Sequence, residues 1–267
     1  MRYSLPIVVE ISKRQRQPMS RLDQITRKID RSDGDYPRRL RSILGSKSPE
    51  KLSAIGNIDL LNHESISFCG SRNVSEKGLE AASLCARTAV RNGFIVVSGN
   101  ARGVDRATHQ TALREDSATI LVLPEGIEKF RIAPELRDFW DWNRVLVISQ
   151  FADNAIWRSY QAMERNRTIM ALSCAMIVVE SGEKGGTKAA GEDALRLKIP
   201  LFAVDYGFDE NVGPGNRDLI SKGAVPLKRS KTSGEPNFGS LIMAARDFCS
   251  VEYLGGASEP LEQQTLF

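Results

Sequence analysis

Short apolar runs recur along the chain from residue 65 onward, and stretches with helical spacing separate them. The runs are "SISFCG" (65–70), "FIVVSG" (94–99), "ATILVLP" (118–124), "RVLVIS" (144–149), "CAMIVVE" (174–180) and "PLFAV" (200–204). Their apolar residues follow one another with little polar alternation, as in strands that are buried on both faces of a parallel sheet. We therefore predict a strand at each of these positions.

The stretches between the runs carry apolar residues at steps of three and four, which indicates amphipathic helices. The helix over 76–93 is predicted to stop at Gly93 and to bury Leu79, Ala82, Cys85, Ala86 and Ala89. The helix over 160–173 is predicted to bury Met163, Ile169, Met170 and Leu172. Strands that alternate with helices predict a doubly wound α/β fold with a mostly parallel sheet, whose ligands bind beyond the carboxyl ends of the strands.

Composition divides the chain into three parts. Residues 1–60 are polar and are predicted to form a small, basic, helical N-terminal cap, and residues 61–228 hold the α/β domain. Residues 229–267 are predicted to form a linker, a short helix and a flexible tail. The small and polar residues of "KRSKTSGEPNFG" (228–239) are typical of a linker.

Basic residues are concentrated near the N-terminus. Residues 1–60 carry 13 Lys and Arg against 7 Asp and Glu, although the net charge of the whole chain is only +4. Such a segment suits an anionic partner such as nucleic acid, and it is equally typical of a solvated charged surface. No apolar stretch approaches the roughly 18 residues of a membrane helix, and the first residues lack a secretory pattern, so we expect a cytoplasmic protein without membrane contact.

The cysteines and histidines do not predict a metal site. Cys69, Cys85, Cys174 and Cys249 lie far apart without a C-x-x-C pair, and His63 and His109 are the only histidines. Zinc sites in proteins use closely spaced pairs of such ligands. We expect reduced, mostly buried thiols, with neither a metal nor a cofactor.

Three of the predicted strands end in a loop that contains glycine and leads into a helix. These loops are "GSR" (70–72), "SGNARG" (98–103) and "GEKGGTK" (182–188). Glycine lets backbone N–H groups turn toward a ligand, and a helix N-terminus carries a partial positive charge, so each loop suits phosphate. One such loop is also an ordinary tight turn. Because parallel strands share one carboxyl edge, however, all three are expected to line one groove.

Cationic side chains accompany these loops. Arg72, Arg102, Lys184 and Lys188 lie within or beside them, and the predicted helix over 160–173 carries the sequence Arg165-Asn166-Arg167. Guanidinium groups offer forked donors to phosphate oxygens and to bases. The alternative is that these arginines belong to a solvated helix face.

Four ordered blocks resemble the DprA/Smf DNA-processing family. They are "GSR", "SGNARGVDRATHQTAL", "ERNRTIMALSCAMIVVE" and "GPGNRDLISKGA", and the likeness spans about residues 35–227. The resemblance implies a Rossmann-like fold that binds single-stranded DNA in a basic groove, forms a homodimer and assists a RecA-type recombinase in DNA recombination and natural transformation. The loop "GEKGGTKAA" departs from the family pattern, and the 40 residues after Leu227 are too few for the winged-helix domain of many members. We therefore expect a divergent member without that domain.

The resemblance assigns the DNA or phosphate contacts to the three loops and to the Arg-Asn-Arg sequence. The predicted contact residues are Gly70, Ser71, Arg72, Ser98, Gly99, Arg102, Gly103, Arg165, Asn166, Arg167, Gly185, Gly186, Thr187 and Lys188. Few aromatic residues neighbour these loops in the sequence, so base stacking is expected to contribute less than phosphate contact.

No pair of nucleophile and base stands out, and we expect a binding protein rather than an enzyme. His109 is four residues after Asp105, and we predict a local hydrogen bond between them rather than general base catalysis. Glu180, at a strand end, is the best candidate for a catalytic carboxylate. It would serve glycosidic chemistry in one alternative function, that of a nucleotide phosphoribohydrolase, whose glycine-loop pattern the segment "EKGGTKAAGE" matches in part. A second alternative is a nucleotide-binding sensor without turnover, which would use the same phosphate-binding edge.

The tail "QQTLF" offers a separate hypothesis. Gln263, Leu266 and Phe267 have the Q-x-x-L-F spacing of peptides that bind the bacterial sliding clamp, in which the apolar end enters a pocket. Hydrophobic residues also end frayed termini by chance.

Overall fold

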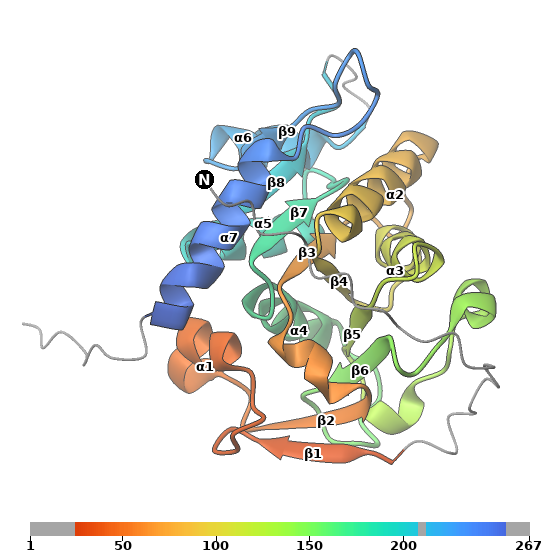
Figure 1. Ribbon diagram of the computed structural model, residues 1–267, viewed down its shortest axis with the longest axis vertical. Helices are drawn as coiled ribbons and strands as arrows, with labels where there is room; N and C mark the ends of the chain where they lie inside the picture. Colours follow the sequence, from red (N-terminus) through yellow and green to blue (C-terminus); the bar gives the residue numbers. More distant parts are fainter. Residues whose placement is uncertain (1–24, 208–211, 255–267) are drawn as a thin grey trace, which may run out of the picture.

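The computed structural model describes residues 25–207 and 212–254, and their strands form one sheet in the order β1-β2-β6-β5-β4-β3-β7-β8-β9 (Figure 1). The strands are β1 (Arg27–Asp30), β2 (Lys51–Gly56), β3 (Ser65–Cys69), β4 (Ile95–Ser98), β5 (Thr119–Leu123), β6 (Val145–Ser149), β7 (Ala175–Val178), β8 (Leu201–Val204) and β9 (Val225–Leu227). All neighbours from β6 to β9 pair in parallel, whereas β1 pairs with β2 and β2 with β6 in antiparallel fashion. The prediction of a mostly parallel doubly wound α/β sheet is confirmed.

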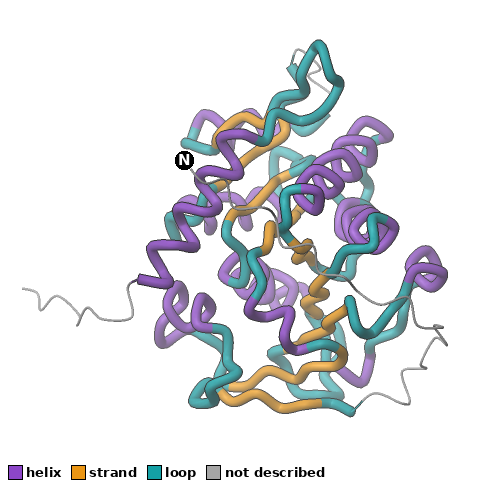
Figure 2. Tube along the Cα trace, viewed as in Figure 1, coloured by secondary structure: helices purple, strands orange, loops and turns teal. Residues whose placement is uncertain are grey.

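Helices cover both faces of the sheet (Figure 2). The α-helices are α1 (Arg38–Leu44), α2 (Glu76–Arg91), α3 (Val104–Arg114), α4 (Ser159–Ala171), α5 (Gly186–Arg196), α6 (Pro214–Ser221) and α7 (Gly239–Leu254), and the 3-10 helices are η2 (Gly45–Lys47), η3 (Ile58–Asn62), η4 (Ile127–Lys129) and η5 (Pro134–Phe139). Side chains of α2, α3 and α7 share one core cluster with the sheet, and those of α1 and α4 share another on the opposite face. None of the helices in the described ranges is long and apolar enough to cross a membrane.

The order of the strands reverses at β3. The chain adds β4, β5 and β6 on one side of β3 and then returns through α4 to add β7, β8 and β9 on the other side. In doubly wound sheets the helices on either side of such a point leave on opposite faces, which opens a crevice at the carboxyl edge. The loops after β3 and β7 therefore begin at the place where this fold binds ligands.

The N-terminal segment differs from the helical prediction. Its described part contains helix α1, but β1 and β2 extend the sheet on the far side of β6. Leu52, Ala54 and Ile55 are buried because β2 lies between two strands of the sheet. The helical prediction is wrong for these two strands, since pairing with β6 involves residues almost 100 positions away, such as Ala54 with Ile148.

Helix α2 forms where it was predicted, with one difference. Ser75 caps its N-terminus, since the Ser75 hydroxyl accepts a hydrogen bond from the Gly78 N–H at 3.0 Å. Ala82, Cys85, Ala86 and Ala89 are buried as predicted, whereas Leu79 is 41% exposed. Leu79 instead lines an open hollow together with Arg106 and Ala107 of α3, so its side chain stays partly in contact with solvent.

The cysteine prediction is wrong for two of the four residues. Cys174 and Cys249 form a disulfide across 75 residues of sequence, whereas Cys69 and Cys85 are free. Helix α7 packs Leu241 and Ala245 against the sheet and so brings Cys249 to the residue that precedes β7. The guanidinium of Arg39, on α1, lies 2.9 Å from the Cys174 sulfur and 2.8 Å from the Cys249 sulfur, and the lower end of α7 lies beside α1 (Figure 1).

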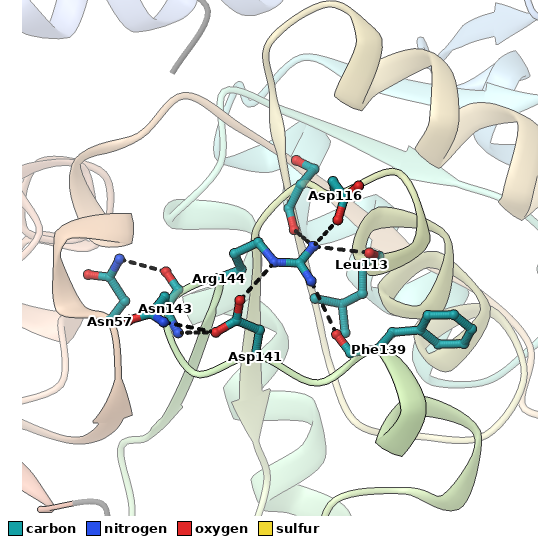
Figure 3. Close-up of polar contacts among 8 residues, drawn as sticks. Asn57, Leu113, Asp116, Phe139, Asp141, Asn143 and Arg144 are labelled. Atoms are coloured by element: carbon teal, nitrogen blue, oxygen red, sulfur yellow. Dashed lines mark hydrogen bonds and ion pairs between the residues drawn. The ribbon is translucent and has the colours of Figure 1, made fainter. Parts of the chain in front are cut away.

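A buried arginine joins the loop before β6 to the end of α3. Arg144 is only 3% exposed, and its guanidinium donates hydrogen bonds to the carbonyls of Leu113, at 3.0 Å, and Phe139, at 3.4 Å (Figure 3). Its Nε donates to the Asp141 carboxylate at 3.3 Å. The carbonyl of Leu113 belongs to the last turn of α3, where helix carbonyls lack partners within the helix, so Arg144 satisfies that end.

Replacing Arg144 by methionine is expected to lower the free energy of unfolding by about 3 kcal/mol, because the buried carbonyls and the Asp141 carboxylate lose their partner. Urea unfolding followed by circular dichroism measures this. The exposed Arg137, in η5, provides a matched control, since Arg137→Met is expected to change stability by less than about 0.5 kcal/mol. Equal effects of the two substitutions would contradict the assignment.

Reduction of the Cys174–Cys249 disulfide is expected to lower the free energy of unfolding by about 4 kcal/mol, since the bond closes a long loop in the unfolded chain. Unfolding midpoints of the oxidised chain, with and without dithiothreitol, measure this. The Cys249→Ala variant should match the reduced chain and should not respond to dithiothreitol. A midpoint that is indifferent to reductant in the unsubstituted chain would count against the bond.

Candidate nucleic-acid interface

A hollow of about 580 Å³ lies at the carboxyl edge of β3 and β7, where the strand order reverses. We call it the central hollow. Its walls come from the loop after β3, the first turns of α4 and the loop that leads into α5. The predicted contact residues that line it are Gly70, Ser71, Arg72, Arg165, Asn166, Gly186 and Thr187. Ala101 of the second glycine loop lines it as well, so the structure brings residues from all three glycine loops and the Arg-Asn-Arg sequence to one place.

Two glycines allow the first two loops to pack against each other. A Cβ atom at Gly70 would lie 2.3 Å from a methyl group of Val104, and one at Gly103 would lie 2.3 Å from the Ser71 carbonyl oxygen. Gly103 also has a φ angle of +81°, which favours glycine. The Val104 N–H donates to the Ser71 carbonyl at 3.3 Å. The two loops therefore hold each other's backbone in place.

Arg165 lies inside the molecule, contrary to the predicted exposed face. Its side chain is 5% exposed, and Nη1 donates to the Val122 carbonyl of β5 at 2.6 Å. A Cβ atom at Gly99 would lie 1.9 Å from this Nη1 and 2.4 Å from the Asp105 carboxylate. Gly99 therefore leaves the space in which the two charged groups face each other. Met163, predicted to be buried, is 44% exposed instead, because α4 turns its arginine toward the sheet edge.

Asp105 balances the charge of Arg165. Its carboxylate accepts a hydrogen bond from the Ala101 N–H at 3.1 Å, and it is 7% exposed. Burial raises the pKa of Asp105, and Arg165 opposes that shift. Burial also raises the pKa of the neighbouring Cys69 thiol to about 12, so this thiol stays protonated. The floor of the central hollow thus places a guanidinium beside a carboxyl group whose pKa is raised by burial.

The rim of the central hollow is cationic and exposed. Arg72 and Lys184 are exposed and line the opening, and the Arg72 guanidinium lies 5.6 Å from the ring centre of Trp157. Helix α5 begins at the same rim without a side-chain cap and without an acid in its first turn, so its first N–H groups are available to an anion. Among the described lining residues, Asp105 is the single acid.

A second hollow, of about 350 Å³, adjoins the first. Arg72 and Asn73 line both, and the second is also lined by Gly103 and Arg106 between α2 and α3. Arg102 is exposed at the start of α3. Ser98 and Gly99 are buried behind these surfaces, where the Ser98 hydroxyl donates to the Phe68 carbonyl at 2.8 Å. These two residues shape the loop rather than its surface.

The remaining predicted contacts lie near the central hollow without lining it. Arg167 forms an ion pair with Asp193 at 3.0 Å, and Lys188 forms one with Asp218 at 3.0 Å. Gly185 is exposed and precedes α5 with a φ angle of +115°. A ligand would reach Arg167 or Lys188 only in competition with these carboxylates.

His109 has a structural position that differs from the predicted one. Its Nε2 lies 2.7 Å from the Gly99 carbonyl and its Nδ1 lies 2.6 Å from the Thr119 hydroxyl. A carbonyl oxygen can only accept, so the neutral ring carries its proton on Nε2. Burial lowers the pKa of His109 to about 4. The ring therefore positions Gly99. The hydrogen bonds to the Gly99 carbonyl and the Thr119 hydroxyl replace the predicted bond to Asp105.

Glu180 is also engaged by the fold. Its carboxylate accepts hydrogen bonds from the Ser75 N–H at 3.2 Å and from the Ser75 hydroxyl at 2.5 Å, and its backbone carbonyl accepts from the Ser71 N–H at 2.8 Å. Glu180 thus ties β7 to the start of α2. In the part of the chain that the structure describes, no cluster of His, Cys, Asp or Glu could hold a metal ion.

Sequence reasoning missed several residues at this interface. Asn73, Trp157 and Ser159 line the central hollow and were not considered in the sequence analysis. Met163 and Lys184 line it too, but the sequence analysis had named Met163 only as a core residue and Lys184 only as a countercharge. Trp157 lies in the segment before α4, far from every glycine loop in the sequence, so neighbourhood in the chain gave no signal. The fold nevertheless brings Trp157 to the central hollow, and the expectation that stacking contributes less than phosphate contact stays a prediction. Gln263, Leu266 and Phe267 lie outside the described residues, and the clamp hypothesis stays a prediction.

Curated relatives share this sequence over most of its length. The chain is 29% identical over 194 residues to DNA processing protein DprA of Streptococcus pneumoniae, and this match covers 72% of this chain and 67% of the relative. It is 29% identical over 199 residues to DprA of Bacillus subtilis, with 73% and 66% covered. The match to protein Smf of Escherichia coli is 27% identical and covers 66% of this chain and 48% of the relative. The matched region is thus about half to two thirds of the relatives' length.

Solved structures show the same fold. The crystal structure of DprA from S. pneumoniae superposes with a TM-score of 0.69 at 28% identity, covering 76% of this chain and 71% of that one. A structure of DprA from Helicobacter pylori, described for its single-stranded DNA binding mode, has a TM-score of 0.64 at 23% identity. The superposition covers 75% of this chain and 90% of that one. A sequence model of the family described as DNA recombination-mediator protein A matches residues 27–235. This chain therefore belongs to the DNA recombination-mediator protein A family.

Proposed function

We propose that this protein binds single-stranded DNA at the central hollow and acts in DNA processing. Its relatives are described as DNA processing proteins, and the H. pylori structure is described for its single-stranded DNA binding mode. The observation that carries the proposal is the cationic rim at the reversal point of the sheet. Arg72, Lys184 and the uncapped start of α5 present donors at an edge where the only acid among the described lining residues is the buried Asp105. Such a rim attracts a polyanion.

Exposed apolar side chains beside the rim favour a single strand over a duplex. Ile156, Trp157, Tyr160 and Met163 are each between 44% and 64% exposed on the segment before α4 and on its first turns. Aromatic rings of this kind stack with unpaired bases, which a duplex keeps inside its own stack. Arg72 lies over Trp157, so a phosphate contact and a stacking contact would adjoin each other.

The path of the strand is proposed to continue from the central hollow toward the second one. Arg72 and Asn73 belong to both, and Arg102 and Arg106 extend the cationic surface along α3. Glu135 pairs with Arg106 at 2.9 Å. Burial opposes the shift, but a backbone hydrogen bond together with Arg106 and Arg102 lowers the pKa of Glu135. Gly103 lines the second hollow and remains a proposed contact there. Arg167, Gly185 and Lys188 remain proposed contacts of lesser weight, because they lie beside the two hollows rather than in their lining.

The geometry favours binding over bond cleavage. A phosphoribohydrolase would need a carboxylate free to act on a sugar in the hollow. The Glu180 carboxylate instead accepts two hydrogen bonds from Ser75 at the start of α2. We therefore propose that the central hollow binds DNA. The alternative functions are those of a phosphoribohydrolase and of a nucleotide sensor.

The assembly and cellular role are proposed from the family. A homodimer, assistance to a RecA-type recombinase and a cytoplasmic location follow from the resemblance to DprA proteins. Sedimentation velocity measures the oligomeric state. A strand-exchange assay on a single strand coated with a single-strand-binding protein, run with and without this protein, measures its assistance to the recombinase. Equal rates of strand exchange would count against this role.

Titration of a fluorescein-labelled dT oligonucleotide at several salt concentrations tests the proposal. The slope of log affinity against log salt is expected to be roughly −0.7 for each phosphate contact, so Arg72→Ala and Lys184→Ala should each make the slope about 0.7 less steep. The exposed Lys47, in η2 and outside both hollows, serves as the matched control in Lys47→Ala. Binding that neither rim substitution alters would remove the central hollow as the DNA site, and a duplex that competes as well as the single strand would contradict the preference.

Trp157→Ala is expected to lower the affinity for the same oligonucleotide by about tenfold, because stacking with a base contributes roughly 1–3 kcal/mol. The salt slope should stay close to that of the unsubstituted protein, since no cation is removed. Trp157→Phe keeps a stacking ring and should retain most of the affinity. Equal losses for the alanine and phenylalanine variants would show that Trp157 acts through Arg72 rather than through a base.

A further inference from the structure

The Cys174–Cys249 disulfide lies away from the proposed DNA site. Cys174 directly precedes β7, whereas the central hollow lies at the carboxyl edge of that strand. Cys249 belongs to α7, whose lower end lies beside α1 (Figure 1). The pair is therefore at the opposite end of β7 from the rim and the floor described above.

A cation faces both sulfur atoms of this disulfide. The Nη1 of Arg39, on α1, lies 2.9 Å from the Cys174 Sγ and 2.8 Å from the Cys249 Sγ. The Nη2 of the same guanidinium donates to the His63 carbonyl at 2.7 Å. The His63 carbonyl thus holds the guanidinium in the position from which it contacts the sulfurs.

The disulfide itself gains little from this cation. Its sulfurs carry no charge and are weak acceptors, and both cysteines belong to an apolar cluster with Leu241 and Ala245. A guanidinium placed beside such a cross-link gives up part of its hydration for a weak contact. A thiolate at the same position would accept a charge-assisted hydrogen bond from it. The arrangement therefore favours a sulfur that carries negative charge.

The two sulfurs differ in their access to solvent. Cys174 is 0% exposed and Cys249 is 9% exposed, and the neighbours Arg246 and Ser250 on α7 are exposed. In thiol–disulfide exchange a thiolate attacks one sulfur of the disulfide and expels the other as a thiolate. An attack from solvent therefore reaches Cys249, and Cys174 is the group that leaves.

From these observations we infer that Cys174 and Cys249 form a thiol–disulfide exchange site, in which Arg39 stabilises the thiolate that leaves from Cys174. The co-reactant is a low-molecular-weight thiol. Such a thiol loses its proton to water and bonds through sulfur to Cys249, while the bond between the two cysteines breaks and its electron pair stays on the Cys174 sulfur.

A second molecule of the thiol completes the reduction. Its sulfur bonds to the sulfur of the first thiol, the mixed disulfide at Cys249 breaks, and Cys249 takes up the proton of the second thiol. Two thiols are thereby oxidised to one small disulfide, and the two cysteines are reduced. Before this step, the Cys174 thiolate can attack Cys249 and expel the added thiol, which closes the bond again.

The exchange does not require the chain to unfold. Leu241 and Ala245 pack α7 against the sheet independently of the bond. The guanidinium of Arg39 is already in place, so the charge that develops on the leaving sulfur meets a preorganised donor. The proposed cytoplasmic location would supply the co-reactant, because glutathione helps to keep thiols reduced in that compartment.

Reduction of the oxidised full chain by glutathione tests the inference, with the reduced fraction of Cys174 and Cys249 measured by alkylation and mass spectrometry. Arg39→Gln is expected to slow the opening by about tenfold, because a less stabilised thiolate leaves more slowly. Arg39→Lys keeps a cation and should retain most of the rate. Arg38, the exposed neighbour on α1, is the matched control, and Arg38→Gln should react like the unsubstituted chain. Equal rates for Arg39→Gln and Arg38→Gln would overturn the inference.

The dependence of the rate on urea separates exchange in the folded chain from exchange after unfolding. Below the unfolding transition, direct attack on the folded chain should give a rate that changes little with urea. A rate that rises in parallel with the global unfolding constant would make the bond a purely structural cross-link and would overturn the inference. In the urea-unfolded chain all variants should react equally, because Arg39 no longer faces the sulfurs, and a persisting difference would contradict the role of the fold.

The mixed disulfide identifies the leaving group. Brief reaction with glutathione, an acid quench and peptide mapping are expected to find glutathione on Cys249, and glutathione on Cys174 would contradict the assignment. If Arg39→Gln does not fold, the urea dependence and the position of the mixed disulfide in the unsubstituted chain decide. None of these measurements involves DNA, so their outcome is independent of the proposed function.

Discussion

The buried guanidinium of Arg165 is the contact on which the interface depends. It enters the space that Gly99 leaves, donates to the Val122 carbonyl of β5 and faces Asp105 at the start of α3. One side chain from α4 thus joins β4, β5 and α3 at the carboxyl edge. A buried charge of this kind is stable only with such partners around it. Its position decides how α4 lies and therefore where Trp157, Ser159 and Met163 meet the loop after β3.

The loops around this arginine are held in place before any ligand arrives. Gly103 lies against Ser71, Gly70 lies against Val104, and Glu180 binds both the Ser71 N–H and the Ser75 cap of α2. Each loop restrains its neighbour through backbone atoms. Donors that are already oriented do not lose conformational freedom on binding, which leaves more of the interaction energy for affinity.

Charge is divided between the rim and the floor of the central hollow. Arg72 and Lys184 are exposed, so their attraction to an anion is long-ranged and screened by salt. The pair of Asp105 and Arg165 is buried and balanced, so it acts only at contact and through geometry. A surface with this division attracts a polyanion from a distance at its rim, whereas the buried pair acts only on a group that reaches the floor.

The amino-acid sequence determined the strands, the helices and the loops of the sheet edge, because each of these is encoded by a local signal. An unbroken apolar run predicts a buried strand, Ser75 predicts a helix start, and glycine before a helix predicts a phosphate loop. The family followed from the same residues. The depth of each side chain was a different matter: the hydrophobic pattern placed Met163 inside and Arg165 outside, and the structure has the reverse.

Only the tertiary structure decided these contacts, since they join residues that are distant in the sequence. Arg165 is buried because Gly99, Asp105 and Val122 surround it, β2 is a strand because β6 lies beside it, and Cys174 bonds Cys249 because α7 crosses the sheet. Trp157 reaches Arg72 for the same reason. Local periodicity reports which face of an element is apolar, but it carries no information about the particular partner that a charged or aromatic side chain meets.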